Sequence, residues 1–145
     1  MTLGSGTRYR AADPVRTTRL VAAAAAVLTV GAGLALRAVA DGDVAKYGGD
    51  ALYTVLLLAL VVLAAPRLTP LTAAATALAA SWAIEFLQLT DIPAELSERS
   101  VVARLVLGST FNAPDLFWYA TGAAAGWLVH TAVNSSRPHQ EPARR

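Results

Sequence analysis

One carboxyl side chain stands near the end of a long apolar run that begins at about Leu71. Ser81, Glu85 and Gln88 follow one another at i, i+4 and i+7, so they share one face of a helix. An ionisable group at membrane depth costs about 3 kcal/mol on insertion scales and usually faces a bundle interior or a wet cavity. Glu85 could therefore serve as a general base, hold a polar ligand, or form a structural hydrogen-bonded pair.

Composition indicates that this helix lies in a bilayer. Apolar residues make up 55% of the chain and charged residues only 15%, whereas soluble domains carry about 25% charged residues. The absence of cysteine excludes disulfides and thiolate metal sites, and the spacing of His130 and His139 matches no metal motif. We expect no metal and no other cofactor. A net charge of +2 is too small to indicate a nucleic-acid partner.

Four apolar segments predict an all-α membrane protein built as a four-helix transmembrane bundle. They span residues 20–36, 50–65, 71–89 and 115–133. The first could instead be a signal peptide, because Ala38-Val39-Ala40 forms a small-residue cleavage motif. We favour its retention, because this run is longer than a typical signal core.

The chain is short enough to form one domain at most. Residues 1–19 are basic and contain helix breakers, among them Pro14, and we expect a disordered arm there. Residues 20–133 form the predicted transmembrane domain, and residues 134–145 a polar tail.

The connections between the spans differ in length. Residues 37–49 are expected to form a polar loop that ends at Gly48-Gly49, and residues 66–70 a tight turn between antiparallel helices. Residues 90–114 form the long connection. Apolar residues recur there at helical spacing, which favours a short amphipathic helix at the membrane interface over a plain solvated loop. These residues are Val101, Val102, Leu105 and Val106.

The distribution of basic residues predicts the orientation in the membrane. The N-terminal arm, the 66–70 turn and the C-terminal tail hold eight of the 12 lysines and arginines. With four spans, these segments all fall on one side, so the positive-inside rule places both termini in the cytoplasm. The chain is therefore expected to pass through the membrane several times.

This orientation brings polar residues together at the extracytoplasmic ends of the helices. The predicted ligand-binding set comprises Asp50, Tyr53, Glu85, Gln88, Arg104, Asp115 and Tyr119. Lys46, Arg99 or Arg104 could pair with the carboxylates. Asp50 and Asp115 could equally be helix N-caps, and the aromatic residues could form an interfacial belt.

The last apolar segment contains a helix-packing motif. Gly122 and Gly126 form a GxxxG element on the same face as Asp115 and Tyr119. Such an element permits close approach of another helix, within the chain or in an oligomer.

These residues occur in an order that resembles a known family. The segments are residues 46–53, Glu85 to Leu89, Arg104 with residues 107–111, and Asp115-Leu116 with Tyr119, Gly122 and Gly126. Together they resemble a small bacterial membrane family catalogued as domain of unknown function 2809. The third and fourth spans are also similar to VanZ-like proteins, which pair a Glu-x-x-Gln helix with a later Gly-x-Thr-Phe…Asp segment. The resemblance covers about residues 20–133.

The resemblance implies a multi-pass protein of the bacterial inner membrane without an established activity. VanZ-like proteins are linked with glycopeptide (teicoplanin) resistance and the cell envelope. We therefore expect a protein that binds a membrane lipid or a lipid-linked cell-wall precursor. One alternative is an intramembrane enzyme with Glu85 as general base and Asp115 as acid or metal ligand, although no nucleophile arrangement is evident. Another is a structural partner that packs through Gly122 and Gly126.

Overall fold

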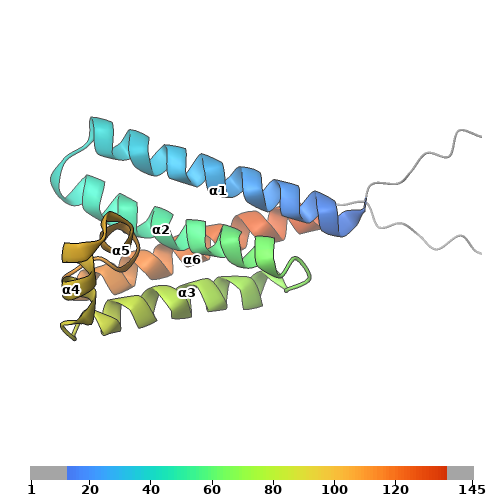
Figure 1. Ribbon diagram of the computed structural model, residues 1–145. Helices are drawn as coiled ribbons and strands as arrows, with labels where there is room; N and C mark the ends of the chain where they lie inside the picture. Colours follow the sequence, from blue (N-terminus) through green and yellow to red (C-terminus); the bar gives the residue numbers. More distant parts are fainter. Residues whose placement is uncertain (1–12, 137–145) are drawn as a thin grey trace, which may run out of the picture.

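The computed structural model describes residues 13–136, and all of their regular secondary structure is helical (Figure 1). This confirms the predicted all-α class. The chain order is α1 (Pro14–Val39), α2 (Gly42–Ala64), α3 (Pro70–Leu87), α4 (Ile92–Arg99), α5 (Val101–Leu107) and α6 (Ala113–Ser135).

Three of these helices, α1, α2 and α3, are long and apolar enough to cross a membrane. They indicate a membrane protein. Helix α6 has 23 residues but does not belong to this group. The fourth span therefore stays a prediction.

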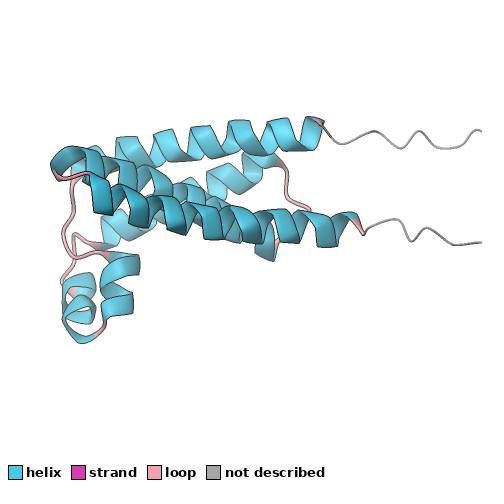
Figure 2. Cartoon of the chain, turned by 90° about the horizontal axis from the view of Figure 1, so that it is seen from above, coloured by secondary structure: helices cyan, strands magenta, loops and turns pink. Residues whose placement is uncertain are grey.

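The four long helices lie along one another, with α2 in contact with α1, α3 and α6. Helix α3 also packs against α6, and α4 packs against α5. The start of α1, the α2–α3 turn and the end of α6 lie at one end of the bundle (Figure 1). Figure 2 shows both short helices at the opposite end, set to one side of the long ones. We call these two ends the terminal end and the α4–α5 end.

The interior of the bundle is narrow and built mainly from small residues. Its apolar core consists of Ala22, Leu58, Val62, Ala73, Ala74 and Ala77. Many large apolar side chains remain exposed on the outside, among them Leu28 and Val27 on α1 and Leu128 on α6. A soluble monomer rarely leaves so much apolar surface open, whereas a helix that faces lipid does so.

Helix α1 begins at Pro14 rather than near Leu20, because Pro14 starts this helix and does not break it. Proline is well suited to the first helical position, where its missing N–H would lack a partner anyway. Asp13 is the N-cap, and its Oδ1 accepts the backbone N–H of Val15 at 3.0 Å. The rest of the predicted arm, residues 1–12, and residues 137–145 of the predicted tail lie outside the described residues.

Helix α2 begins at Gly42, so the prediction that Gly48-Gly49 ends a polar loop is wrong. Both glycines lie inside α2, where Gly48 permits close approach of α1. A Cβ atom at Gly48 would lie 2.6 Å from Cδ2 of Leu36. Each glycine costs a helix about 1 kcal/mol relative to alanine, and the packing of α2 on α1 offsets this cost. Asp50 is consequently not an N-cap, because it lies within the helix.

The long connection contains two short helices where one was expected. Helix α5 confirms that residues 101–107 are helical, while its predicted place at the membrane interface stays a prediction. Helix α4 was not predicted; its Pro93 lies in the first turn, where a proline does not interrupt a helix. The α2–α3 turn agrees with the sequence, since α2 ends at Ala64 and α3 starts at Pro70.

Candidate functional site

Glu85 lies in the last turns of α3 and is only 1% exposed. Both of its carboxyl oxygens accept hydrogen bonds from the α6 region. Oε1 accepts the backbone N–H of Asn112 at 2.5 Å, and Oε2 accepts the hydroxyl of Tyr119 at 3.2 Å. Glu85 therefore joins α3 to the start of α6 through hydrogen bonds. The dipole of α6 also favours a negative charge at this position.

Asp115 lies in the first turn of α6, and its side chain is nearly buried. Its Oδ1 accepts hydrogen bonds from the ammonium group of Lys46 and from the side-chain amide of Asn112. Asn112, and not Asp115, is the N-cap residue of α6. The carboxylate of Asp115 thus joins the second turn of α2 to the start of α6.

Lys46 and Asp50 complete a group of polar side chains at the α4–α5 end. The ammonium nitrogen of Lys46 lies 3.3 Å from Oδ2 of Asp50, one helical turn further along α2. We define the polar cluster as Lys46, Asp50, Glu85, Asn112, Asp115 and Tyr119. It brings three carboxyl groups and one ammonium group together from three helices.

A hydrogen bond between hydroxyl groups lies deeper along the same helix faces. Thr54 Oγ1 and Ser81 Oγ are 2.9 Å apart, and both residues are buried. Because Ser81 donates to the carbonyl of Ala77, Thr54 is the donor of the pair. This contact joins α2 to α3 and extends the polar face of Ser81 and Glu85 towards the middle of the bundle.

Three members of the predicted ligand-binding set contact the α4–α5 segment instead of the carboxylates. Tyr53 donates its hydroxyl to the carbonyl of Val106 at 2.9 Å, and Gln88 donates its amide to the carbonyl of Leu107 at 2.5 Å. The Oε1 atom of Gln88 is buried without a hydrogen-bond partner among residues 13–136. These contacts hold the two short helices against the end of the bundle.

Arg104 is the third of these residues, and the expected pairing with a carboxylate does not occur within the described chain. Its Nε and Nη2 atoms donate to the carbonyl of Ser97 at 3.2 and 3.0 Å. Ser97 lies in the last turn of α4, where unpaired carbonyl groups attract cations. Lys46 takes the role of the cation in the polar cluster.

The glycines of the GxxxG element lie where α6 meets α2. A Cβ atom at Gly122 would lie 2.2 Å from the carbonyl oxygen of Ala51, and one at Gly126 would lie 3.1 Å from Cδ1 of Leu58. The close crossing at Gly122 is one turn below the polar cluster. It keeps Asp115 and Tyr119 on α6 within reach of the side chains on α2 and α3.

Aromatic residues surround the cluster. The rings of Tyr47 and Trp118 are stacked, with centroids 5.5 Å apart, and those of Tyr53 and Tyr119 are tilted, with centroids 6.2 Å apart. The predicted interfacial belt is not tested by these contacts. In the part of the chain that the structure describes, no group of three or more His, Cys, Asp or Glu side chains is arranged to hold a metal ion.

Asn112 is the member of the polar cluster that the sequence analysis missed. The signal was present, because an asparagine directly before Ala-Pro-Asp is typical of an N-cap followed by proline in the first turn. The bond from its backbone N–H to Glu85 depends on the packing of α3 against α6, which local sequence does not specify.

The sequence profile of a protein family matches residues 39–123, more than half of the chain. The chain belongs to the DUF2809 family. This family is described as a protein of unknown function. The matched region contains every residue of the polar cluster defined above and the close helix crossing at Gly122. It excludes nearly all of α1. No curated protein and no solved structure matches the chain. The similarity to VanZ-like proteins stays a prediction.

Proposed function

We propose that this DUF2809 protein is a four-span protein of the bacterial inner membrane, with both termini cytoplasmic and the α4–α5 end outside. In this arrangement α6 is the fourth span. The proposal is supported by the position of the start of α1, the α2–α3 turn and the end of α6 at one end of the bundle. Arg16, Arg19 and Arg67 lie in these elements, as the positive-inside rule expects of a cytoplasmic end.

The proposed function is binding of the polar headgroup of an envelope lipid or a lipid-linked cell-wall precursor at the polar cluster. One observation supports it above the others: Asp50 and Asp115 share a single ammonium group, that of Lys46, and Glu85 adds a third carboxyl group to the same cluster. Arg104, the nearby alternative cation, binds the carbonyl of Ser97 instead. A headgroup that carries an amine would compensate this excess of carboxyl groups through charge-assisted hydrogen bonds.

The exposure of the side chains suggests how a headgroup would enter. Lys46 is 44% exposed, Asp50 20% and Asp115 7%, while Glu85 is closed off behind them. A headgroup arriving from the membrane surface would meet Asp50 first and reach Asp115 by displacing part of the Lys46 contact. In this proposal Glu85 positions Asn112 and Tyr119 and does not touch the ligand.

The geometry favours binding over the enzymatic alternative. A general base must lie within hydrogen-bonding reach of its substrate. Both oxygens of Glu85 already accept hydrogen bonds, and the residue is buried. The structural-partner alternative is also weaker, because Gly122 and Gly126 are buried against α2 of the same chain.

The test is lipid binding to the full-length protein. Native mass spectrometry would compare phosphatidylethanolamine, which carries an amine, with phosphatidylcholine, whose nitrogen has no hydrogen to donate. We expect preferential retention of phosphatidylethanolamine, and loss of that preference in Asp50→Asn. Asp43→Asn is the matched control, because Asp43 is exposed in the first turn of the same helix. Equal retention of both lipids by the wild type would contradict the proposal.

A further inference from the structure

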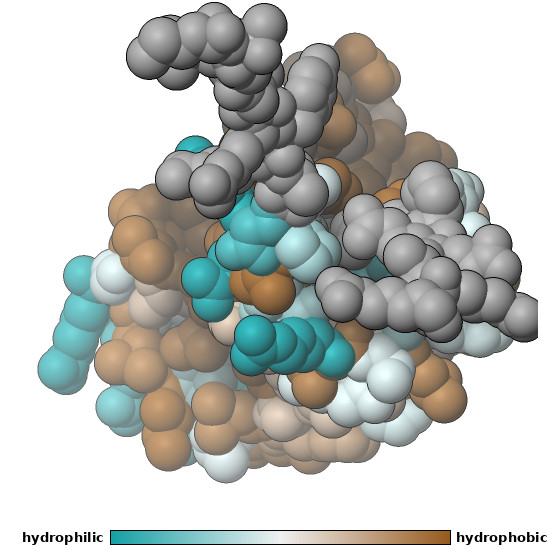
Figure 3. All heavy atoms as spheres, turned by 90° about the vertical axis from the view of Figure 1, so that its right-hand side faces the viewer, coloured by the Kyte–Doolittle hydropathy of each residue, from teal (hydrophilic) through white to brown (hydrophobic). Residues whose placement is uncertain are grey.

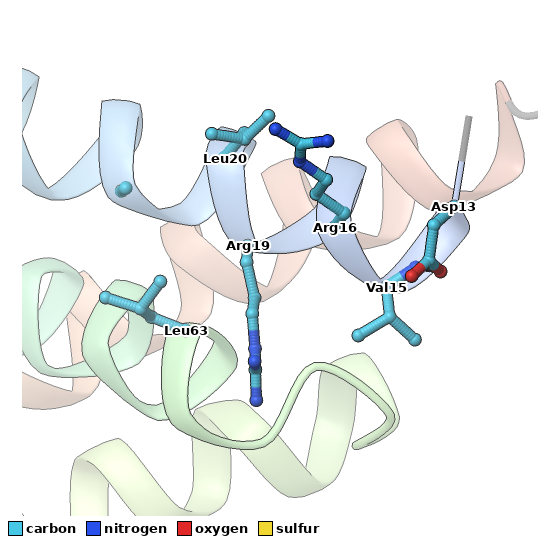
Figure 4. Close-up of a pocket in the computed structure, with 7 residues that line it drawn as sticks. Asp13, Val15, Arg16, Arg19, Leu20 and Leu63 are labelled. Atoms are coloured by element: carbon cyan, nitrogen blue, oxygen red, sulfur yellow. Dashed lines mark hydrogen bonds between the residues drawn. The ribbon is translucent and has the colours of Figure 1, made fainter.

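The terminal end of the bundle has a groove of its own. It has a volume of about 410 Å³ and is lined by Asp13, Val15, Arg16, Arg19, Leu20, Ala23 and Leu63 (Figure 4). An adjoining groove of about 300 Å³ shares Val15 and Arg19 with it and continues over the α2–α3 turn to Arg67. Figure 3, which looks onto this end, shows several hydrophilic residues close together, with hydrophobic residues beside them.

Three arginines give these grooves a positive charge. Arg16 and Arg19 lie in the first turns of α1, and Arg67 lies in the α2–α3 turn. Within residues 13–136, none of them forms an ion pair, since both ion pairs there belong to Lys46. The acidic residue in the lining, Asp13, has its Oδ1 atom occupied by the N–H of Val15. Three guanidinium groups against this one carboxylate leave the grooves with a net positive charge.

The other wall of the groove is apolar. Leu20 and Ala23 lie on α1, and Leu63 lies on α2, both of which are long and apolar enough to cross a membrane. In Figure 4, Arg19 extends from α1 towards α2, between Leu63 and Val15. Charged and apolar surfaces therefore meet where the spans begin and end, which is the level of the lipid headgroups.

We propose that this groove is a binding site for an anionic phospholipid. The phosphate would lie between Arg19 and Arg67, with Arg16 at the rim, because the planar guanidinium group forms paired hydrogen bonds with phosphate oxygens. One acyl chain would follow the apolar surface of Leu20, Ala23 and Leu63. Basic pockets between membrane helices commonly bind anionic headgroups in this way.

This site is separate from the polar cluster in position and in charge. It lies at the opposite end of the bundle, and it selects an anion where the polar cluster selects an amine. It requires only that α1 and α2 lie in a membrane, so it does not depend on which side of the membrane the terminal end faces.

The test uses the full-length protein in detergent, with phosphatidylglycerol as the anionic probe and phosphatidylcholine as the neutral one. Native mass spectrometry would give the apparent affinity for each lipid. We expect the wild type to prefer phosphatidylglycerol, with a preference that falls as salt rises. Arg19→Gln combined with Arg67→Gln should weaken phosphatidylglycerol binding by about 25-fold, at about fivefold for each arginine near a membrane surface.

Two further variants distinguish a specific binding site from general attraction of anionic lipid to a basic surface. Arg37→Gln removes a charge from the last turn of α1, at the other end of the bundle, and should leave the affinity unchanged. Ala23→Phe narrows the apolar part of the groove without changing any charge, and it should also weaken binding. If Arg37→Gln lowers the affinity by about the fivefold expected for each groove arginine, or if Ala23→Phe has no effect, the groove is not the site.

Inorganic phosphate distinguishes the lipid from a free anion. We expect millimolar phosphate to compete poorly with phosphatidylglycerol, because phosphate lacks the acyl chain. Complete displacement by phosphate would overturn the assignment to a lipid. The preference of the wild type is measured without any substitution, so equal affinity for the two lipids overturns the proposal even if a variant fails to fold.

Discussion

The hydrogen bond between Tyr119 and Glu85 offers a direct test of the contacts that hold α3 against α6. The Glu85→Gln substitution keeps the shape of the side chain but replaces one of two acceptor oxygens with an NH₂ group. Oε1 and Oε2 each accept one hydrogen bond, from Asn112 N–H and Tyr119 O–H respectively. One of these donors must therefore turn away or face another donor.

The expected loss follows from the strength of the two bonds. A hydrogen bond to a charged group contributes about 1.5–3 kcal/mol, and one between neutral groups about 0.5–1.5 kcal/mol. Glu85 is 1% exposed, so water cannot replace a lost partner. We expect Glu85→Gln to lower the free energy of unfolding by about 2–3 kcal/mol. Tyr119→Phe removes one bond and should cost about 1–2 kcal/mol.

The assay is denaturant or thermal unfolding in detergent, read by circular dichroism, on both single variants and the double variant. Because the two side chains are bonded to each other, the double variant should lose about 1 kcal/mol less than the sum of the single losses. Tyr47→Phe is the control: none of the described hydrogen bonds uses its hydroxyl group, and it should be close to neutral. Wild-type stability of Glu85→Gln would refute this account, as would its rescue by Arg104→Gln, since Arg104 binds Ser97.

Three further predictions concern other parts of the bundle. Gly122→Ala should destabilise the protein by about 1–3 kcal/mol in the same unfolding assay, because its Cβ would lie 2.2 Å from the backbone oxygen of Ala51. Gly126→Ala should cost less, since the atom it meets is the end of the Leu58 side chain; equal losses would contradict the close crossing. Lys46→Gln removes the ammonium group between Asp50 and Asp115 and should lower the free energy of unfolding by about 1–2 kcal/mol, a value discounted for the exposure of Lys46. High salt should reduce the difference in stability between this variant and the wild type. Unchanged stability of the variant would argue against the ion pairs. Reporter fusions in the 90–114 connection and at the C-terminus should report opposite sides of the membrane, and a cytoplasmic signal from both would rule out the four-span orientation.

The helical class and the face that bears Glu85 could be predicted from the sequence, because both depend on local periodicity. The apolar run before Glu85 and the spacing of Ser81 and Glu85 identify α3 without knowledge of its neighbours. Ser81 and Glu85 are indeed buried on the inner side of that helix.

The start of α2 and the partner of Arg104 could not be predicted in this way. Gly48 and Gly49 have low helix propensity, and only the packing of α1 against Gly48 explains why the helix continues through them. The hydrogen-bond partner of Arg104 depends on which carboxylates and carbonyl groups tertiary packing places near it. A count of charges therefore cannot distinguish its bond to Ser97 from a bond to Asp115.

Headgroup binding at the polar cluster is best tested by a structure of crystals grown in a lipid mesophase that contains phosphatidylethanolamine. We expect a headgroup at the α4–α5 end, with its amine within hydrogen-bonding distance of Asp50 and Asp115. The contacts of Glu85 with Asn112 and Tyr119 should remain intact. A closed cluster, in which Asp50 and Asp115 contact only Lys46 and Asn112 in the presence of the lipid, would contradict this expectation and assign these residues a purely structural role.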